Sequence, residues 1–257
     1  MISTVTKAHA QQEILLLAMK AGQIQLENGA EIFRVEDTIM HICRAYGLHS
    51  VHIFVLSNGI FLSCGDETEP LFAKVLQVPV NNTNLRRVAE VNQLSRRIEE
   101  EGLSPENVRR ELTRIEEHPG FPAALQIAVA GLAGACFGVM FGGSPWDFLC
   151  SIVVGSLYQA YAVYLGNPHL GRIVRTILGS AWITFLCILC YRFGPGGIIL
   201  MVPGVAFTNA IRDMVESDYI SGSVRMLDAV ISFFCIAIGV GVVLALYGNI
   251  AGAPLLP

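Results

Sequence analysis

Apolar residues recur at helical spacing near the start of the chain. Over residues 13–26 they form a dense stripe that includes Leu17 and Ile24, and this spacing predicts a helix. A second stripe, with apolar residues three and four positions apart, runs through NGAEIFRVEDTIMHICRAYG (28–47). Gly47 closes it, and glycine is the usual residue just past the end of a helix. Two helices are therefore expected before any strand.

Three short runs of β-forming residues come next, VHIFVL (51–56), IFLSC (60–64) and AKVLQVPV (73–80). Asn58-Gly59 lies between the first two runs and is a strong signal for a hairpin turn. Two charged helices follow, and the second is expected to begin at Ser104-Pro105, where a capping serine precedes a proline. Residues 1–118 are thus predicted to form an α+β domain that buries one face of a small sheet against helices.

The chain after Phe121 is strongly apolar and predicts an all-α membrane domain over residues 119–257. Five spans are expected, at about 122–141, 146–165, 173–193, 197–212 and 228–247. Each but the fourth has the roughly 20 apolar residues that a bilayer requires. The first span carries small residues at four-residue steps, which predicts close packing within the chain or with a partner. These residues are Ala130, Gly134, Gly138 and Gly142.

Composition and charge divide the chain in the same way. It is 53% hydrophobic and 15% charged, which is too apolar for an ordinary soluble domain. Arginine and glutamate concentrate in residues 84–118 and are sparse after Phe121. The net charge is -4 and no basic patch is free of acidic residues. Nucleic acid is therefore not an expected partner, whereas the lipid bilayer is.

Basic residues also predict the orientation, because Lys and Arg are enriched on the cytoplasmic side of a membrane. With the amino-terminal domain in the cytoplasm, Arg172 and Arg175 fall in a cytoplasmic loop, as do Arg212 and Arg225. Of the arginines near the spans, only Arg192 then lies outside. The expected arrangement has a cytoplasmic N-terminus, a periplasmic C-terminus and an odd number of spans.

Residues that could serve a metal or a cofactor are scattered. The seven cysteines have no partnering histidines, and the six histidines are dispersed. No G-x-S-x-G, H-E-x-x-H or P-loop pattern is present. The sequence therefore predicts no enzyme, no metal and no cofactor, and without a nucleotide site any transport is expected to be driven by a proton or other ion gradient.

The fourth span is interrupted by Pro203-Gly204. Proline removes a backbone N–H and disrupts the helix one turn earlier, and such breaks survive in membranes where they line an enclosed or wet cavity. A half-helix that begins after the break would point its positive end into the membrane, where secondary transporters hold anionic groups. Thr208 and Asn209 add hydrogen-bonding groups one turn on, and Arg212 can pair with a carboxylate.

We take ten residues as candidates for substrate binding. They are Pro203, Gly204, Thr208, Asn209, Arg212, Asp213, Asp218, Ser221, Arg225 and Gln159. Two alternatives stay open. The Pro-Gly pair could be a packing kink, with Arg212 and Asp213 as an interfacial anchor pair. Gln159 could face a polar cavity or bond a neighbouring helix.

Two stretches resemble the threonine/serine exporter family. MVPGVAFTNAIRDMVESDYISGSVRMLDA (201–229) is similar to its signature region, and ENGAEIFRVEDTI (27–39) is similar to its amino-terminal motif. The resemblance spans nearly the whole chain. It implies an inner-membrane exporter of small carboxylates, either threonine and serine or, in split systems, dicarboxylates such as succinate. In the amino-terminal domain it singles out Gly29, Glu31, Arg34 and Glu36.

Because the chain stops soon after the fifth span, it resembles the larger half of the split type. The resemblance then implies a separate small membrane partner, and we expect a higher-order oligomer. Two other classes remain as alternatives. One is a membrane-anchored enzyme with Glu31, Arg34 and Glu36 as its site, and the other is a non-transporting scaffold or regulatory subunit.

Overall fold

The computed structural model describes residues 2–65, 72–79, 83–165, 170–189 and 204–251. Contacts divide the chain into two compact units. The first unit contains residues 1–119 together with 206–226, and the second contains 120–205 together with 227–257. Each unit is described by itself below.

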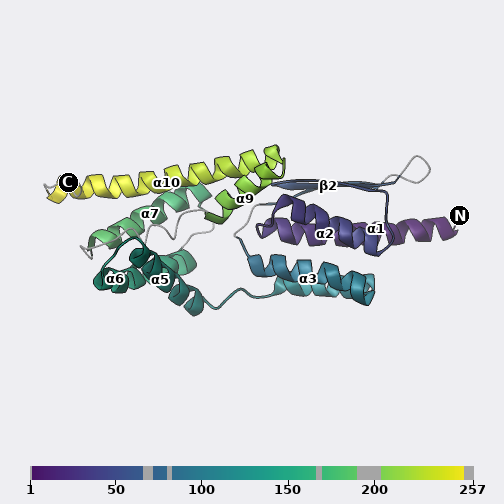
Figure 1. The fold of residues 1–257 in the computed structure, drawn as a ribbon, viewed down its shortest axis with the longest axis horizontal. Coiled ribbons are helices and arrows are strands. Elements are labelled where there is room, and N and C mark those ends of the chain that lie inside the picture. The colour runs from purple at the N-terminus through teal and green to yellow at the C-terminus, as the bar shows by residue number, and fades with distance from the viewer. Residues whose placement is uncertain (1, 66–71, 80–82, 166–169, 190–203, 252–257) are drawn as a thin grey trace. The chain divides into compact units, whose positions relative to one another are not determined.

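The first unit contains a three-stranded sheet and helices. Within residues 1–119 its elements are α1 (Ile2–Glu27), α2 (Ile32–Ala45), β1 (Val51–Leu56), β2 (Gly59–Cys64), β3 (Phe72–Gln77), α3 (Leu85–Glu101) and α4 (Pro105–Glu117). Most of α9 (Gly204–Val215) and the first turns of α10 (Tyr219–Ala251) complete the unit. The strands are antiparallel in the order β1-β2-β3. The sheet packs on α1 and α2, and these two helices pack in turn on α3 and α4 (Figure 1). Three layers result, as the sequence predicted for helices against one sheet face.

Local sequence signals placed several of these elements correctly. Leu56 pairs with Gly59, so the predicted hairpin turn is confirmed. The side chain of Ser104 caps α4 by accepting the N–H of Asn107, with proline at the start of the helix. Gly47 follows α2 with a φ of 77°, in the left-handed region that favours glycine.

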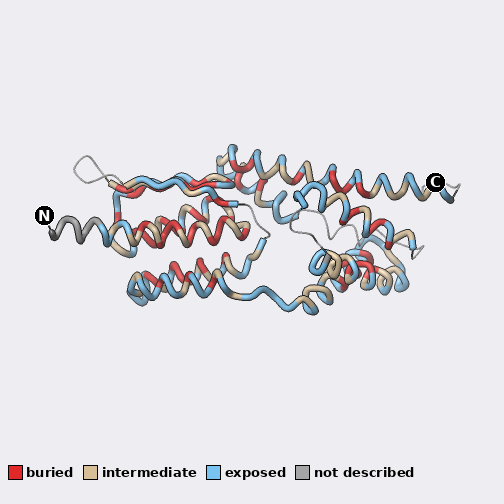
Figure 2. The backbone as a smooth tube through the Cα atoms, turned by 180° about the vertical axis from the view of Figure 1, so that it is seen from behind, coloured by how far each residue is buried: buried red, intermediate tan, exposed pale blue. Residues whose placement is uncertain are grey.

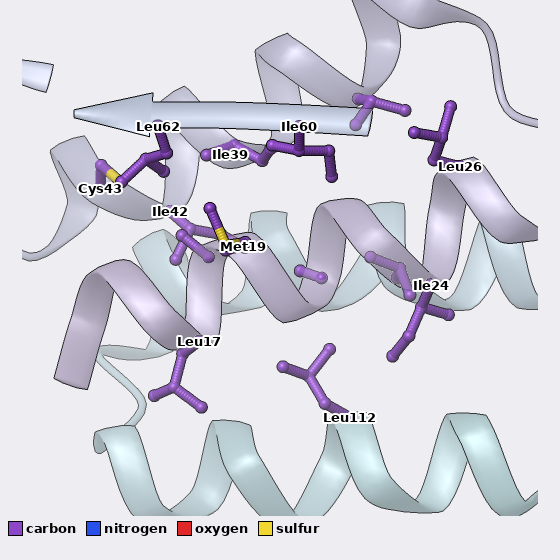
Figure 3. Packing of buried hydrophobic residues seen from close by; sticks show 14 of the residues in the cluster. Leu17, Met19, Ile24, Leu26, Ile39, Ile42, Cys43, Ile60, Leu62 and Leu112 are labelled. Atoms are coloured by element: carbon purple, nitrogen blue, oxygen red, sulfur yellow. The ribbon is translucent and has the colours of Figure 1, made fainter. Parts of the chain in front are cut away.

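The core of the first unit lies between its layers (Figure 3). Ile39 and Ile42 of α2 lie beneath the β2 strand that carries Ile60, and all three side chains are at most 1% exposed. On the opposite side, Leu112 projects from α4 toward the α1 helix. Burial of each such side chain contributes about 1.5–3 kcal/mol. The other face of the sheet is open, and Phe54, Phe61 and Val75 form an exposed row across the three strands.

The second unit is helical in the part that the structure describes. It contains α5 (Ala123–Met140), α6 (Pro145–Ala160), a π-helical turn (Tyr161–Leu165), α7 (Arg172–Leu189) and the later part of α10 (Tyr219–Ala251). Three described helices, α5, α7 and α10, are long and apolar enough to cross a membrane. At most 28% of the most apolar stretch of each of these helices is buried inside the protein, and Figure 2 shows their largely exposed surfaces. Such apolar exposure suits contact with lipid, while the five-span layout stays a prediction.

Small residues join α5 closely to α6. The buried positions of α5 are Gly131, Gly134, Ala135 and Gly138. Gly134 and Gly138 were predicted, but Ala130 is half-buried and Gly142 lies exposed beyond the helix end. The packing face follows steps of three and four because a helix turns every 3.6 residues, so a strict four-residue step drifts off it.

We expect Gly131→Ala to weaken this helix pair. A methyl group at Gly131 would lie 2.8 Å from the carbonyl oxygen of Ile152 and would also clash with the Ser156 hydroxyl. Overpacking of this kind costs about 1–3 kcal/mol, partly offset by the better helix propensity of alanine. The measurement is the apparent Tm of the purified protein in detergent. Gly248→Ala is the control, since nothing lies within 4 Å there, and equal Tm values for both variants would contradict the prediction.

Candidate functional site

A tight turn links α1 to α2 and exposes backbone carbonyls. The Asn28 side chain donates to the carbonyl of Ile24 at 2.7 Å, and the Ala30 N–H donates to the carbonyl of Gln25 at 3.0 Å. Gly29 has a φ of 84°, which disfavours any residue with a Cβ. The backbone of this turn therefore leaves the carbonyl groups of Gly29 and Ala30 free to accept hydrogen bonds from residues outside α1 and α2.

Those partners come from α9 (Gly204–Val215) and the first turns of α10, which belong to the same unit. The Asn209 side chain donates to the Gly29 carbonyl at 2.9 Å, and Arg225 donates to the Ala30 carbonyl at 2.9 Å. Arg212 forms an ion pair with Glu31. We call these three contacts the clasp. They hold the segment around α9 on the turn between α1 and α2.

A buried ion pair lies behind the clasp. Asp213 is 1% exposed, and its Oδ2 lies 2.9 Å from Nη1 of Arg225. Its Oδ1 also accepts a long hydrogen bond, 3.5 Å, from the backbone N–H of Ile32. A buried carboxylate is costly unless it is paired. Asp213 and Arg225 therefore depend on each other, and together they fix how α9 and α10 meet the start of α2.

Glu36 is not part of the clasp and contacts the sheet instead. Its carboxylate accepts the backbone N–H of Val55 at 3.0 Å, which ties α2 to β1. Burial raises the pKa of Glu36 above its usual value, the Val55 hydrogen bond opposes this rise, and the negative charge of Asp218 adds to it. Asp218 itself accepts the N–H of Ser221 at the start of α10. Both carboxylates thus have structural contacts within the first unit.

A pocket of about 280 Å³ lies beside the clasp. Its polar lining residues are Glu31 and Arg34 of the amino-terminal motif, Asn209 of α9 and Asn92 of α3, together with Gly29 and Ala30. The other lining residues from α3 are apolar: Leu85, Val88 and Ala89. Pockets for small ligands combine an apolar lining with a few polar groups in this way, and this volume lies just below their usual range of about 300–1,000 Å³.

A larger, more open hollow of about 520 Å³ lies along α4. Its arginines are each paired with a nearby glutamate: Arg109 with Glu13, Arg110 with Glu106 and Arg114 with Glu111. Pairs on a solvated helix surface are typical of local ion pairing and do not indicate a ligand site. We therefore assign the candidate site to the smaller pocket.

The structure brings part of the predicted set together. Asn209, Arg212, Asp213 and Arg225 meet the turn that carries Gly29 and Glu31, and Asn209 lines the same pocket as Arg34. The pocket residues from α3 were not predicted, because nothing in their pattern distinguishes them from the apolar face of an ordinary helix.

Other predicted residues lie elsewhere. Pro203 is outside the described residues, and Gly204 begins α9. Thr208 is exposed, whereas Ser221 is fully buried. Gln159 belongs to the second unit, where its amide donates to Gln126 of α5 at 3.3 Å. The bond to a neighbouring helix is one of the two alternatives left open for Gln159. Within the described ranges, no group of three or more His, Cys, Asp or Glu residues could hold a metal ion.

Comparisons with known proteins give the chain its relatives. A threonine/serine exporter of Corynebacterium glutamicum is 24% identical over 246 residues, covering 89% of this chain and 50% of the relative. A protein of Escherichia coli K12 named "Probable succinate transporter subunit YjjP" is 26% identical over 250 residues, covering 92% of this chain and 94% of the relative. No solved structure matches.

The relatives differ in length. The chain spans about half of the Corynebacterium glutamicum protein and 46% of a Mycobacterium tuberculosis protein named "Probable threonine/serine exporter", which is 21% identical. The ThrE family model, described as "Putative threonine/serine exporter", matches residues 16–247. Since this match covers most of the chain and includes both the turn at Gly29 and the segment around α9, the chain belongs to the threonine/serine exporter family.

Proposed function

We propose that the chain is a subunit of a secondary exporter that moves small carboxylates out of the cell. Its membrane domain, residues 119–257, has five spans, with the fourth a broken helix, in the bacterial inner membrane. The N-terminus and residues 1–118 are cytoplasmic, and the C-terminus is periplasmic. The substrate is threonine or serine, or a dicarboxylate such as succinate.

One observation carries this proposal. The signature segment around α9 is bound to the turn of the amino-terminal motif, beside a small pocket with an arginine and two asparagines. Arginine pairs with carboxylates in a bidentate manner, and amides can hydrogen-bond either oxygen or nitrogen groups. A site of this composition suits a small carboxylate that carries a second polar group.

We further propose a small membrane partner subunit that supplies the remaining helices, within a higher-order oligomer. Support comes from the E. coli relative, which this chain matches over 94% of its length and whose name contains the word "subunit". Membership in an exporter family argues against a membrane-anchored enzyme built on Glu31, Arg34 and Glu36. Glu36 is moreover occupied in bonding β1.

Flux measurements test the proposal directly. The chain and its small partner are placed in vesicles, and transport of labelled succinate, threonine, serine and lactate is measured with and without a pH gradient. We expect saturable transport of at least one of these carboxylates. A well-folded complex that transports none of them would favour the scaffold alternative.

Arg212→Ala should reduce this transport by about two- to fivefold, because it removes a half-exposed ion pair between α9 and the turn, worth up to about 1 kcal/mol. Arg110→Ala is the control, since Arg110 is an exposed arginine that pairs with Glu106, four residues away on its own helix. Equal flux in the Arg212→Ala and Arg110→Ala variants would show that transport does not depend on Arg212. Flux is expressed per amount of folded, reconstituted protein in each sample.

A further inference from the structure

Glu31 occupies an unusual position, because its carboxylate faces two arginines. Its Oε2 accepts from Nε and Nη2 of Arg34, both at 3.3 Å, while its Oε1 pairs with Arg212. The Glu31 side chain is 13% exposed, whereas Arg34 and Arg212 are 41% and 51% exposed. The three side chains together carry a formal charge of +1. A mostly buried carboxylate is thus shared between two guanidinium groups that solvent can reach.

The hydrogen bonds between Arg34 and Glu31 are longer than is usual for a charged pair. Charge-assisted N–H···O bonds are normally about 2.7–2.9 Å long, so two bonds of 3.3 Å leave room for a better partner. Arg34 lines the 280 Å³ pocket together with Asn92 and Asn209. A carboxylate that enters the pocket can pair with the Arg34 guanidinium, while its carbon atoms contact the apolar lining formed by Leu85 and Val88.

Glu31 and Asn209 connect the pocket to the clasp. Asn209 lines the pocket and also bonds the Gly29 carbonyl. When a ligand carboxylate takes Arg34, the Glu31 carboxylate no longer divides its charge between two arginines. It then pairs with Arg212 alone, which strengthens the hold of the turn on α9.

We propose that this pocket binds the carboxylate group of a small organic acid through Arg34, and that Glu31 transmits its occupancy to α9. Arg34 is the binding residue, and Glu31 is a positioning residue that acts through Arg212. The identification of the ligand as the exported solute rests on the function proposed above, whereas the pocket and its coupling rest on the contacts around Glu31. Binding of a ligand in this pocket of the first unit would therefore strengthen the contact between the turn and α9.

Binding is tested on the purified full-length chain at low salt, by calorimetric titration with succinate and with L-threonine as the probes. We expect the wild type to bind at least one probe, Arg34→Ala to weaken that binding about tenfold or more, and Arg34→Lys to recover part of it. Arg110→Ala is again the matched control and should bind like the wild type. The proposed binding of a carboxylate by Arg34 is wrong if Arg34→Ala leaves the affinity unchanged, or if the wild type binds neither probe.

Coupling is tested by hydrogen exchange on the same proteins. The bound probe should slow amide exchange in residues 29–32 and in α9 of the wild type. In Glu31→Gln the probe should bind more tightly than in the wild type, because the neutral amide no longer competes for Arg34, but the slowing in α9 should be lost. Equal slowing in Glu31→Gln and in the wild type overturns the role of Glu31.

These results are distinguishable from a failure of the exporter function. Normal flux by an Arg34→Ala variant that no longer binds the probe would overturn the identification of the pocket ligand as the exported solute and leave the exporter proposal intact. Conversely, probe binding that depends on Arg34, in a complex without flux, would support the pocket and contradict export.

Discussion

Replacement of Arg225 by alanine should destabilise the first unit by about 3 kcal/mol or more. The substitution leaves the Asp213 carboxylate, which is 1% exposed, without its cation. Removal of one member of a buried ion pair typically costs about 3–5 kcal/mol, because the remaining charge is uncompensated. It also removes the hydrogen bond to the Ala30 carbonyl. The expected result is a large fall in Tm and in the yield of monodisperse protein after extraction in detergent.

Two further variants show whether the charge is responsible. Arg172→Ala removes an arginine that also pairs with an aspartate, Asp228, but both side chains are at least 41% exposed. Exposed pairs contribute about 0–1 kcal/mol, so this control should change the Tm little. Adding Asp213→Asn to Arg225→Ala should restore part of the lost stability, since the buried charge is then gone. An equal fall in Tm for Arg225→Ala and Arg172→Ala would contradict the stabilising role of the buried Asp213–Arg225 pair.

Gly222→Ala is expected to cost up to about 3 kcal/mol of stability and to disturb the clasp as well. A Cβ at this position would lie 2.6 Å from Cγ of Met214 and 3.0 Å from both the Ala210 carbonyl oxygen and the Met214 nitrogen. A side chain can rotate away, but backbone atoms of α9 can move only if the helix itself shifts. Such a shift would pull Asn209 and Arg212 off the turn.

The Gly222 variant should therefore lose both stability and flux. Tm and vesicle transport are the two measurements, and Gly241→Ala is the control on the same helix, because nothing lies within 4 Å of its added methyl group. If Gly222→Ala unfolds at the wild-type temperature and transports normally, α9 does not depend on this close approach.

Local signals in the sequence were sufficient for the elements within residues 1–119 of the first unit, but not for α9, which was expected within a membrane span. The apolar period of α2, the Asn58-Gly59 hairpin and the Ser104 cap each act within a few residues, so a short window contains all the information needed. The turn between α1 and α2 could be expected from Gly29 in the same way. None of these signals depends on a distant part of the chain.

The clasp could not be predicted because its partners lie far apart in the sequence. Asn209 and Gly29 are separated by 180 positions, and Arg225 and Ala30 by 195. No period or spacing connects such residues. Arg212 and Asp213 are adjacent, which suggested one pair, yet Arg212 pairs with Glu31 and Asp213 with Arg225. A polar stretch after a helix break indicates that partners exist, but it does not identify them.

The discontinuity of the first unit has a consequence for biosynthesis. Its last part is residues 206–226, and the final residue of that part is translated 107 residues after position 119 (226 minus 119). At about 5–20 residues per second, a ribosome needs about 5–20 s for this interval. Throughout that time α1 to α4 have already been synthesised, while the carbonyls of Gly29 and Ala30 have no contact with Asn209 and Arg225. Docking of α9 is therefore a late folding event that follows synthesis of α5, α6 and α7.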